Sequence, residues 1–224
     1  MMTLAHKFSL TRVARAFVTT NAPASPTHYD VLVIGGGDAC TRATAAPRSA
    51  ARVALLTHRL SSIGAMSCNP SIGGIGHLVR DLDALDALDG LMPRTAYAAA
   101  IQFRTLNSSW GPAVRGLRAQ CDHAQYSVAV REYQYNHSAA ASLTLLDRAA
   151  QSFILEAAGR VAGIHANLPA AGPAKLRAQA VVLTTGTFIN GRLRFGSHAE
   201  PGGRRGAFSA INIATALRES GLRA

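Results

Sequence analysis

The sequence predicts an α/β protein with a parallel β-sheet, and three neighbouring features carry this prediction. Val31–Ile34 is a short apolar, β-branched run, which is typical of a strand buried on both faces. Three glycines follow it at positions 35–37, and a second apolar run at 53–56 comes after an alanine-rich stretch. Strand, glycine turn, helix and strand within about thirty residues indicate a Rossmann-type βαβ unit, which binds nucleotides.

The glycine turn is the first candidate binding site. Its glycines allow a tight turn and a close approach of the backbone to a pyrophosphate, and the following helix offers free N–H groups to that anion. Cys40 occupies the third glycine position of the motif, where helix and strand pack closely, so its thiol must fit a tight space. Pro47 is expected to kink or shorten the helix.

The second predicted strand is not followed by an acidic residue. A classical NAD site places an acid there to hold the ribose hydroxyls, but no Asp or Glu occurs between Asp38 and Asp81. The strand instead continues into Thr57, His58 and Arg59. Either the ribose is held differently, or the nucleotide of this site is not NAD.

Composition limits the classes of protein to consider. The 224 residues are 48% hydrophobic and 16% charged, which is globular and sufficient for one well-buried domain. A formal charge of +11 favours polyanionic partners such as nucleic acid, although part of it lies in a basic N-terminal segment. No apolar run of membrane-spanning length occurs. The cysteines and histidines show no metal-binding spacing, so we expect no metal and reduced intracellular thiols.

Residues 1–28 have the features of a mitochondrial transit segment and linker, and residues 29–224 those of the folded domain. The segment is basic and rich in hydroxyl side chains, and it has no acid before Asp30. Leu10, Val13 and Phe17 fall on one face of a helix opposite its arginines. We therefore expect import into the mitochondrial matrix; a basic tail without a targeting role is the alternative.

Several long strings together resemble the MnmG/GidA family. GAMSCNPSIGGIGHL at 64–78 resembles the signature loop of this family, and the resemblance continues in IQFR at 101–104. It returns in GPAVRGLRAQ at 111–120 and in AVVLTTGTF at 180–188. The resemblance extends from about residue 29 to residue 205, which is nearly all of the predicted domain.

The resemblance implies a Rossmann-type domain, interrupted by a smaller insert, that binds FAD and not NAD in its first nucleotide site. Members of the family modify C5 of the wobble uridine of tRNA together with an MnmE-type GTPase, and they form homodimers. The product is of the carboxymethylaminomethyl type, or of the taurinomethyl type in mitochondria. A folate supplies the one-carbon unit, and NADH recharges the flavin.

The resemblance also assigns site residues. The motif positions that match FAD contacts are Gly35, Gly36, Gly37, Asp38, Ala39, Cys40, Ala150 and Ser209. Cys68 matches a thiol beside the flavin that acts as a nucleophile or positions the substrate; a small residue in a tight loop is the alternative. Cys121, expected on a helix after Arg115 and Arg118, is interpreted as inert.

Arginines of the central segment are candidate contacts for phosphates of tRNA or cofactor. Arg104, Arg115 and Arg118 are suited to this role, and a solvated helix face is the alternative. With 6% aromatic residues, the sequence shows no aromatic interleaving of the kind found in proteins that bind single strands.

The sequence also departs from the family pattern. Gly74–His77 lacks a lysine and a glycine of the signature loop, and Asp38 and Arg42 replace a histidine and a glutamate in the glycine turn. The sequence ends at Ala224, so we expect an FAD-binding domain that is incomplete at its C-terminus, without the NAD-associated insert and the C-terminal domain. Two alternatives remain open: a non-catalytic remnant that binds FAD, and an unrelated FAD-dependent oxidoreductase of small molecules.

Overall fold

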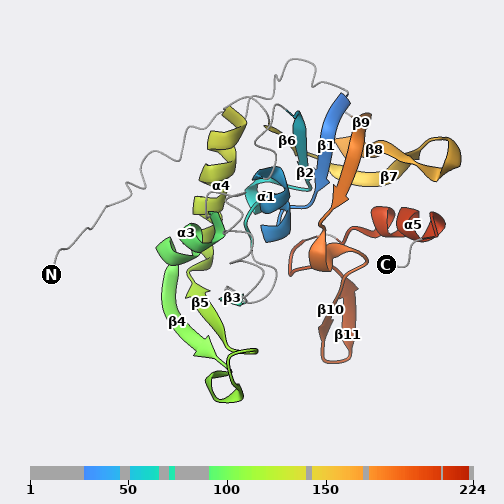
Figure 1. The fold of residues 1–224 in the computed structure, drawn as a ribbon. Helices are drawn as coiled ribbons and strands as arrows, with labels where there is room; N and C mark the ends of the chain where they lie inside the picture. The colour runs from blue at the N-terminus through green and yellow to red at the C-terminus, as the bar shows by residue number, and fades with distance from the viewer. Residues whose placement is uncertain are drawn as a thin grey trace.

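The central element of the computed structural model is a six-stranded sheet in the order β6-β2-β1-β9-β8-β7 (Figure 1). The structure describes residues 28–45, 51–65, 71–73, 91–139, 143–168, 172–207 and 209–221. Four strands are parallel: β6 (Leu143–Asp147), β2 (Val53–Thr57), β1 (His28–Ile34) and β9 (Gly172–Leu183). The antiparallel strands β8 (Val161–Leu168) and β7 (Ala149–Leu155) extend the sheet beyond β9. The predicted α/β fold with a mainly parallel sheet is therefore confirmed.

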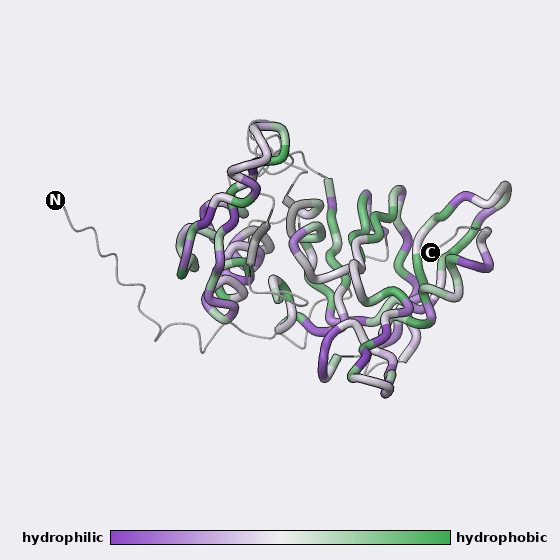
Figure 2. The backbone as a smooth tube through the Cα atoms, turned by 90° about the horizontal axis from the view of Figure 1, so that it is seen from below, coloured by the Kyte–Doolittle hydropathy of each residue, from purple (hydrophilic) through white to green (hydrophobic). Residues whose placement is uncertain are grey.

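Strand β1 lies between β2 and β9, with Val31 opposite Val53 on one side and Ala180 on the other. Successive side chains of a strand point to opposite faces of the sheet. Accordingly, Leu32 and Ile34 pack in one hydrophobic cluster, whereas Val33 packs in the other. This central strand is thus buried on both faces, as its apolar run predicts, and Figure 2 shows hydrophobic residues running through the central strands.

Helices cover both faces of the sheet. On the Val33 side lie α1 (Asp38–Ala45), α3 (Leu91–Ala98) and α4 (His123–Ala139), and Cys40 of α1 packs there against β1 and β2. On the other side, Ile213 of α5 (Ile211–Glu219) packs with residues of β1, β2 and β7. Helix α1 ends at Ala45, and Pro47 lies outside the described residues. No helix in the described ranges has the length and apolar character needed to cross a bilayer.

Two smaller antiparallel sheets extend on the side to which the carboxyl ends of β1 and β9 point (Figure 1). One has the order β3-β5-β4 and comprises β3 (Ser71–Gly73), β5 (Gly116–Cys121) and β4 (Ala100–Leu106). The other pairs β10 (Arg192–Phe195) with β11 (His198–Pro201). The first of these sheets comes from the segment between β2 and β6.

The prediction that Cys121 lies on a helix was wrong, because Cys121 is the last residue of strand β5. The burial of Ala119 and Cys121 alternates with the partial exposure of Arg118 and Gln120, which is the period of a strand and not of a helix. Pairing with β3 on one side and β4 on the other fixes this conformation. Cys121 is buried at the end of β5, and its Sγ donates a weak hydrogen bond to the carbonyl oxygen of Ala96, 3.5 Å away.

Candidate functional site

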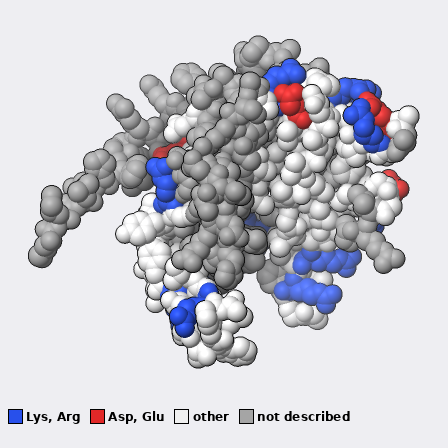
Figure 3. All heavy atoms as spheres, viewed as in Figure 1, with Lys and Arg blue, Asp and Glu red and all other residues white. Residues whose placement is uncertain are grey.

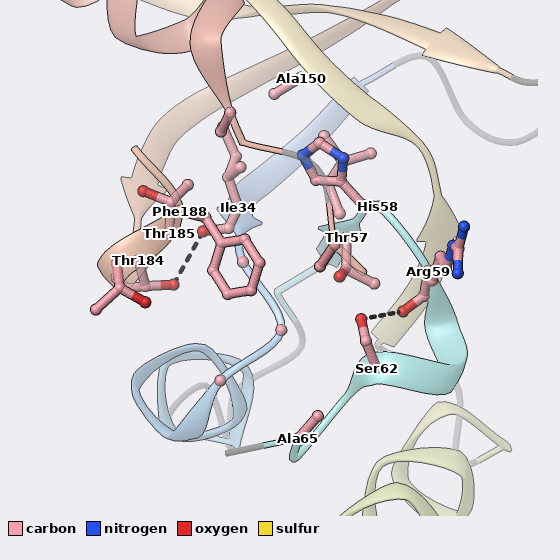
Figure 4. A pocket seen from close by; sticks show the side chains of 18 of the residues that line it. Ile34, Thr57, His58, Arg59, Ser62, Ala65, Ala150, Thr184, Thr185 and Phe188 are labelled. Carbon is pink, nitrogen blue, oxygen red and sulfur yellow. Dashed lines mark hydrogen bonds between the residues drawn. The ribbon is translucent and has the colours of Figure 1, made fainter. Parts of the chain in front are cut away.

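A pocket of about 350 Å³ opens at the carboxyl ends of β1, β2 and β9 (Figure 4). In open α/β sheets, ligands bind in the crevice outside the carboxyl ends of the strands. The start of α1 forms one wall of the pocket, and residues from Gly186 to Phe188 and around Ala207 form others. The predicted glycine turn therefore lies at the ligand position of this class of fold.

The three glycines of the turn have different roles in the packing. Gly35 has a φ of +148°, and a Cβ added there would lie 2.5 Å from the carbonyl oxygen of Thr184, so only glycine fits. A Cβ added at Gly36 would lie 2.8 Å from Oγ1 of Thr57. A Cβ added at Gly37 would have no atom within 4 Å, although Gly37 lines the pocket. The protein itself thus fills the space beside Gly35 and Gly36 and leaves the space beside Gly37 open.

Helix α1 begins at the pocket. Asp38 and Ala39 in its first turn line the pocket, and the first N–H groups of a helix have no acceptor within it. The carboxylate of Asp38 accepts a 2.7 Å hydrogen bond from the hydroxyl of Tyr126 on α4. This bond fixes the one acidic side chain among the described residues that line the pocket.

The pocket is electropositive. Arg59, Arg148 and Arg204 line it, together with His58. Burial lowers the pKa of His58, and the opposing effect of Asp147 is smaller, so this imidazole is neutral at neutral pH. Three guanidinium groups against one carboxylate favour an anionic ligand. The described residues contain no cluster of side chains suited to a metal ion.

Two threonines that follow β9 lie beside the glycine turn and also line the pocket. Oγ1 of Thr184 donates a 3.0 Å hydrogen bond to the carbonyl oxygen of Ile34 and so joins β9 to β1 (Figure 4). Oγ1 of Thr185 is buried and has no hydrogen-bond partner. Buried hydroxyl groups are normally hydrogen-bonded, so Thr185 is available to a polar atom of a ligand. The ring of Phe188 adds an apolar surface nearby (Figure 4).

Most of the residues assigned to FAD from the sequence meet at this pocket. Those that line it are Gly35, Gly36, Gly37, Asp38, Ala39 and Ala150. Ser209 donates a 3.1 Å hydrogen bond to the carbonyl oxygen of Phe188, beside the lining residue Ala210. Cys68, the proposed catalytic thiol, lies outside the described residues.

Cys40 lies behind the pocket wall and is fully buried in the core. Burial, with a further contribution from the carboxylate of Asp38, raises the pKa of its thiol to about 12. The thiol is therefore protonated and poorly nucleophilic at physiological pH. Its side chain fills the helix–strand interface, and only the backbone N–H of Cys40 is close to the turn, donating 3.2 Å to the carbonyl oxygen of Gly37.

Sequence reasoning did not select Thr185, Arg148 or Arg204. Thr185 lies in the string 180–188, but nothing local marks its hydroxyl as buried and unpaired. The two arginines come from separate segments, and only the folded sheet brings them to the same pocket.

Fold and pocket together define a doubly wound α/β domain of the Rossmann class, with its pocket where this class binds nucleotides. Residues 30–224 match the model of the family described as glucose inhibited division protein A, or GidA. The chain therefore belongs to the GidA family.

Solved structures agree with this assignment. GidA from Aquifex aeolicus, in two crystal forms, is 35% identical and superposes with a TM-score of 0.72. The match covers 86% of this chain and 31% of the Aquifex chain, so the present chain spans about a third of that protein. A GidA-related protein from Thermus thermophilus is 22% identical, with a TM-score of 0.53 over 85% of this chain and 68% of its own, and shows the same fold.

Proposed function

We propose that this chain is the FAD-binding part of a flavoprotein that modifies C5 of the wobble uridine in tRNA. The proposal is supported by membership of the GidA family and by the electropositive pocket at the glycine turn. The observation that carries the cofactor assignment is the open space beside Gly37. Gly37 is the second glycine of the motif, and this glycine lets a pyrophosphate approach the backbone.

The residues present fit the ADP part of FAD. The backbone from Gly37 to Ala39 and the start of α1 would hold the pyrophosphate, with Arg59, Arg148 and Arg204 supplying positive charge. The unpaired hydroxyl of Thr185 would donate to a polar atom of the cofactor. The neutral His58 at the end of β2 stands where NAD-binding relatives of this fold carry an acid.

When bound, the flavin supplies the redox chemistry of uridine modification, with NADH as its reductant. The residues of this chain bind and orient the cofactor and shield one side of it from water. Cys68 is proposed as the thiol beside the flavin. We propose an MnmE-type GTPase as partner and a carboxymethylaminomethyl or taurinomethyl product, formed in the mitochondrial matrix. The whole-protein reaction is proposed from family membership, because the chain matches 31% of the Aquifex protein.

Nucleoside analysis by mass spectrometry tests this function. The chain is fused to the part of Aquifex GidA that it does not match and expressed with an MnmE-type GTPase in a host without its own GidA. We expect C5-modified wobble uridine from the fusion and none from its Cys68→Ser variant. Cys121→Ser is the matched control and should retain activity, since Cys121 is buried away from the pocket. No modification by a fusion that folds and retains FAD would contradict the proposed reaction.

A further inference from the structure

We propose that the β4–β5 hairpin is a docking surface for an unpaired RNA segment, a proposal that rests on the tRNA substrate proposed above. The hairpin surface comprises β4, the turn at 107–115, β5 and the adjoining Tyr97 of α3. Within the described part of the chain, most of the large hydrophobic side chains that are exposed lie here: Tyr97, Ile101, Phe103, Trp110, Val114 and Leu117. Such a concentration marks an interaction site.

Aromatic rings form a platform on one face of the hairpin. The rings of Tyr97 and Phe103 lie with centroids 5.7 Å apart, and Tyr97 is 77% exposed. Phe103 is paired with Ala119, which is fully buried, so the platform is anchored on the core at this point. Trp110, at 80% exposure, projects from the turn. Exposed rings on a rigid support are the groups on which bases of single strands stack.

The charge of the same segment selects the partner. Residues 91–121 contain four arginines and no acidic residue. Arg104 on β4 stands directly opposite Arg118 on β5, and in the described part of the chain no carboxylate pairs with either. Like charges directly opposite one another destabilise a strand pair. A phosphate bound between the two guanidinium groups would remove this repulsion.

The position of β4 lets one ligand reach both groups. β4 is the edge strand of the order β3-β5-β4, and Phe103 and Arg104 point to its opposite faces. An RNA strand that crosses the β4 edge of this sheet would stack bases on the aromatic face and place phosphates near Arg104. Unpaired bases are needed for stacking, so the surface fits a loop and not a continuous duplex.

The hairpin surface also has a suitable place in the molecule. It extends on the same side as the carboxyl ends of the strands that form the pocket (Figure 1). Figure 3 shows basic side chains at the lower end of this region, and the turn is closed by hydrogen bonds from Arg115 to Ser108 and from Asn107 to Val114. A loop docked on this ordered hairpin would be held on the pocket side of the sheet.

Fluorescence of the single tryptophan gives a direct assay of the full chain. The probe is an RNA stem-loop with unpaired uridines, and the comparison is the same stem closed as a blunt duplex. We expect the stem-loop to quench the fluorescence of Trp110. We also expect it to bind at least about fivefold more tightly than the duplex, which corresponds to the lower end of the free energy gained by stacking one base on an aromatic ring. Equal affinity for the duplex, or no quenching, would overturn the docking surface.

Substitutions locate the binding. Phe103→Ala should weaken stem-loop binding at least about fivefold. Arg104→Gln should reduce the slope of log affinity against log salt by about one. The matched control is Arg52→Gln, since Arg52 is also exposed but pairs with Asp30 at the amino ends of the strands, and it should bind like the parent.

Two further outcomes separate this proposal from others. In the first, an acidic peptide displaces the stem-loop from the parent chain but not from Phe103→Ala, and Arg104→Gln leaves RNA affinity unchanged. This result would indicate a protein partner and overturn the proposal. Unchanged RNA affinity in both hairpin variants, together with wobble modification by the fusion described above, would refute the docking surface and leave the proposed function standing. Flavin content should be the same in all these variants, because none of the substituted residues lines the pocket.

Discussion

Substitutions in the glycine turn should separate protein stability from cofactor binding. A Cβ at Gly36 would lie 2.8 Å from Oγ1 of Thr57, a stiff side chain that is 5% exposed, so Gly36→Ala should cost about 1–3 kcal/mol of unfolding free energy. A side chain at Gly37 meets no protein atom within 4 Å, so Gly37→Val should change stability by less than about 1 kcal/mol. It should nevertheless weaken FAD binding at least tenfold, or about 1.4 kcal/mol, by blocking the approach of the pyrophosphate.

The assay combines urea unfolding of the apo chain with flavin absorbance per mole of protein after reconstitution. Gly116→Val is the matched control, because a Cβ at Gly116 also has no neighbour within 4 Å and the residue lies on β5, away from the pocket. It should keep both stability and flavin. Equal flavin in Gly37→Val and the parent would refute the assigned site, and an unaltered stability of Gly36→Ala would refute the packing argument.

Three further predictions concern other parts of the chain. Tyr126→Phe removes a hydrogen bond that holds the Asp38 carboxylate beside the pyrophosphate site, so FAD affinity should fall severalfold. Adding Asp38→Asn to this variant should restore FAD affinity, and an equal loss of FAD affinity with and without Asp38→Asn would show that the effect of Tyr126→Phe is only structural. The pKa of the Cys40 thiol is raised from 9.0 to about 12, so between these pH values the folded chain keeps a proton that the unfolded chain loses. The contribution of this thiol to the free energy of unfolding is complete below pH 9 and should fall by about 1.4 kcal/mol per pH unit up to about pH 12. Urea titrations over this range should show the fall in the parent chain, and the contribution should be lost in Cys40→Ala. Residues 1–28 fused to a fluorescent reporter should direct it into mitochondria, and a cytosolic reporter would contradict the predicted transit segment.

The part of the fold that could be predicted is encoded locally. β1, the glycine turn and β2 follow one another, and the burial of Val31–Ile34 on both faces shows directly in the apolar run. The tight environment of Cys40 was also evident, because the motif itself places this residue between helix and strand. Here local pattern and tertiary packing agree.

The rest depends on contacts between distant residues. Arg118 belongs to a strand because β5 pairs with β3 and β4, and its spacing from Arg115 alone is compatible with a helix. The gathering of Trp110, Phe103 and Tyr97 could not be predicted from 6% aromatic residues, because composition does not show which rings remain exposed. The pairing of Asp38 with Tyr126 likewise joins residues of α1 and α4.

The identity of the nucleotide tests the central claim most directly. FAD is titrated into the flavin-free chain while flavin fluorescence is followed, and excess NAD⁺ is then added as competitor. We predict stoichiometric FAD binding that NAD⁺ does not reverse, because the family resemblance assigns FAD to this site and NAD⁺ shares only the ADP part of FAD. Failure of the folded chain to bind FAD, or displacement of FAD by NAD⁺, would contradict the account.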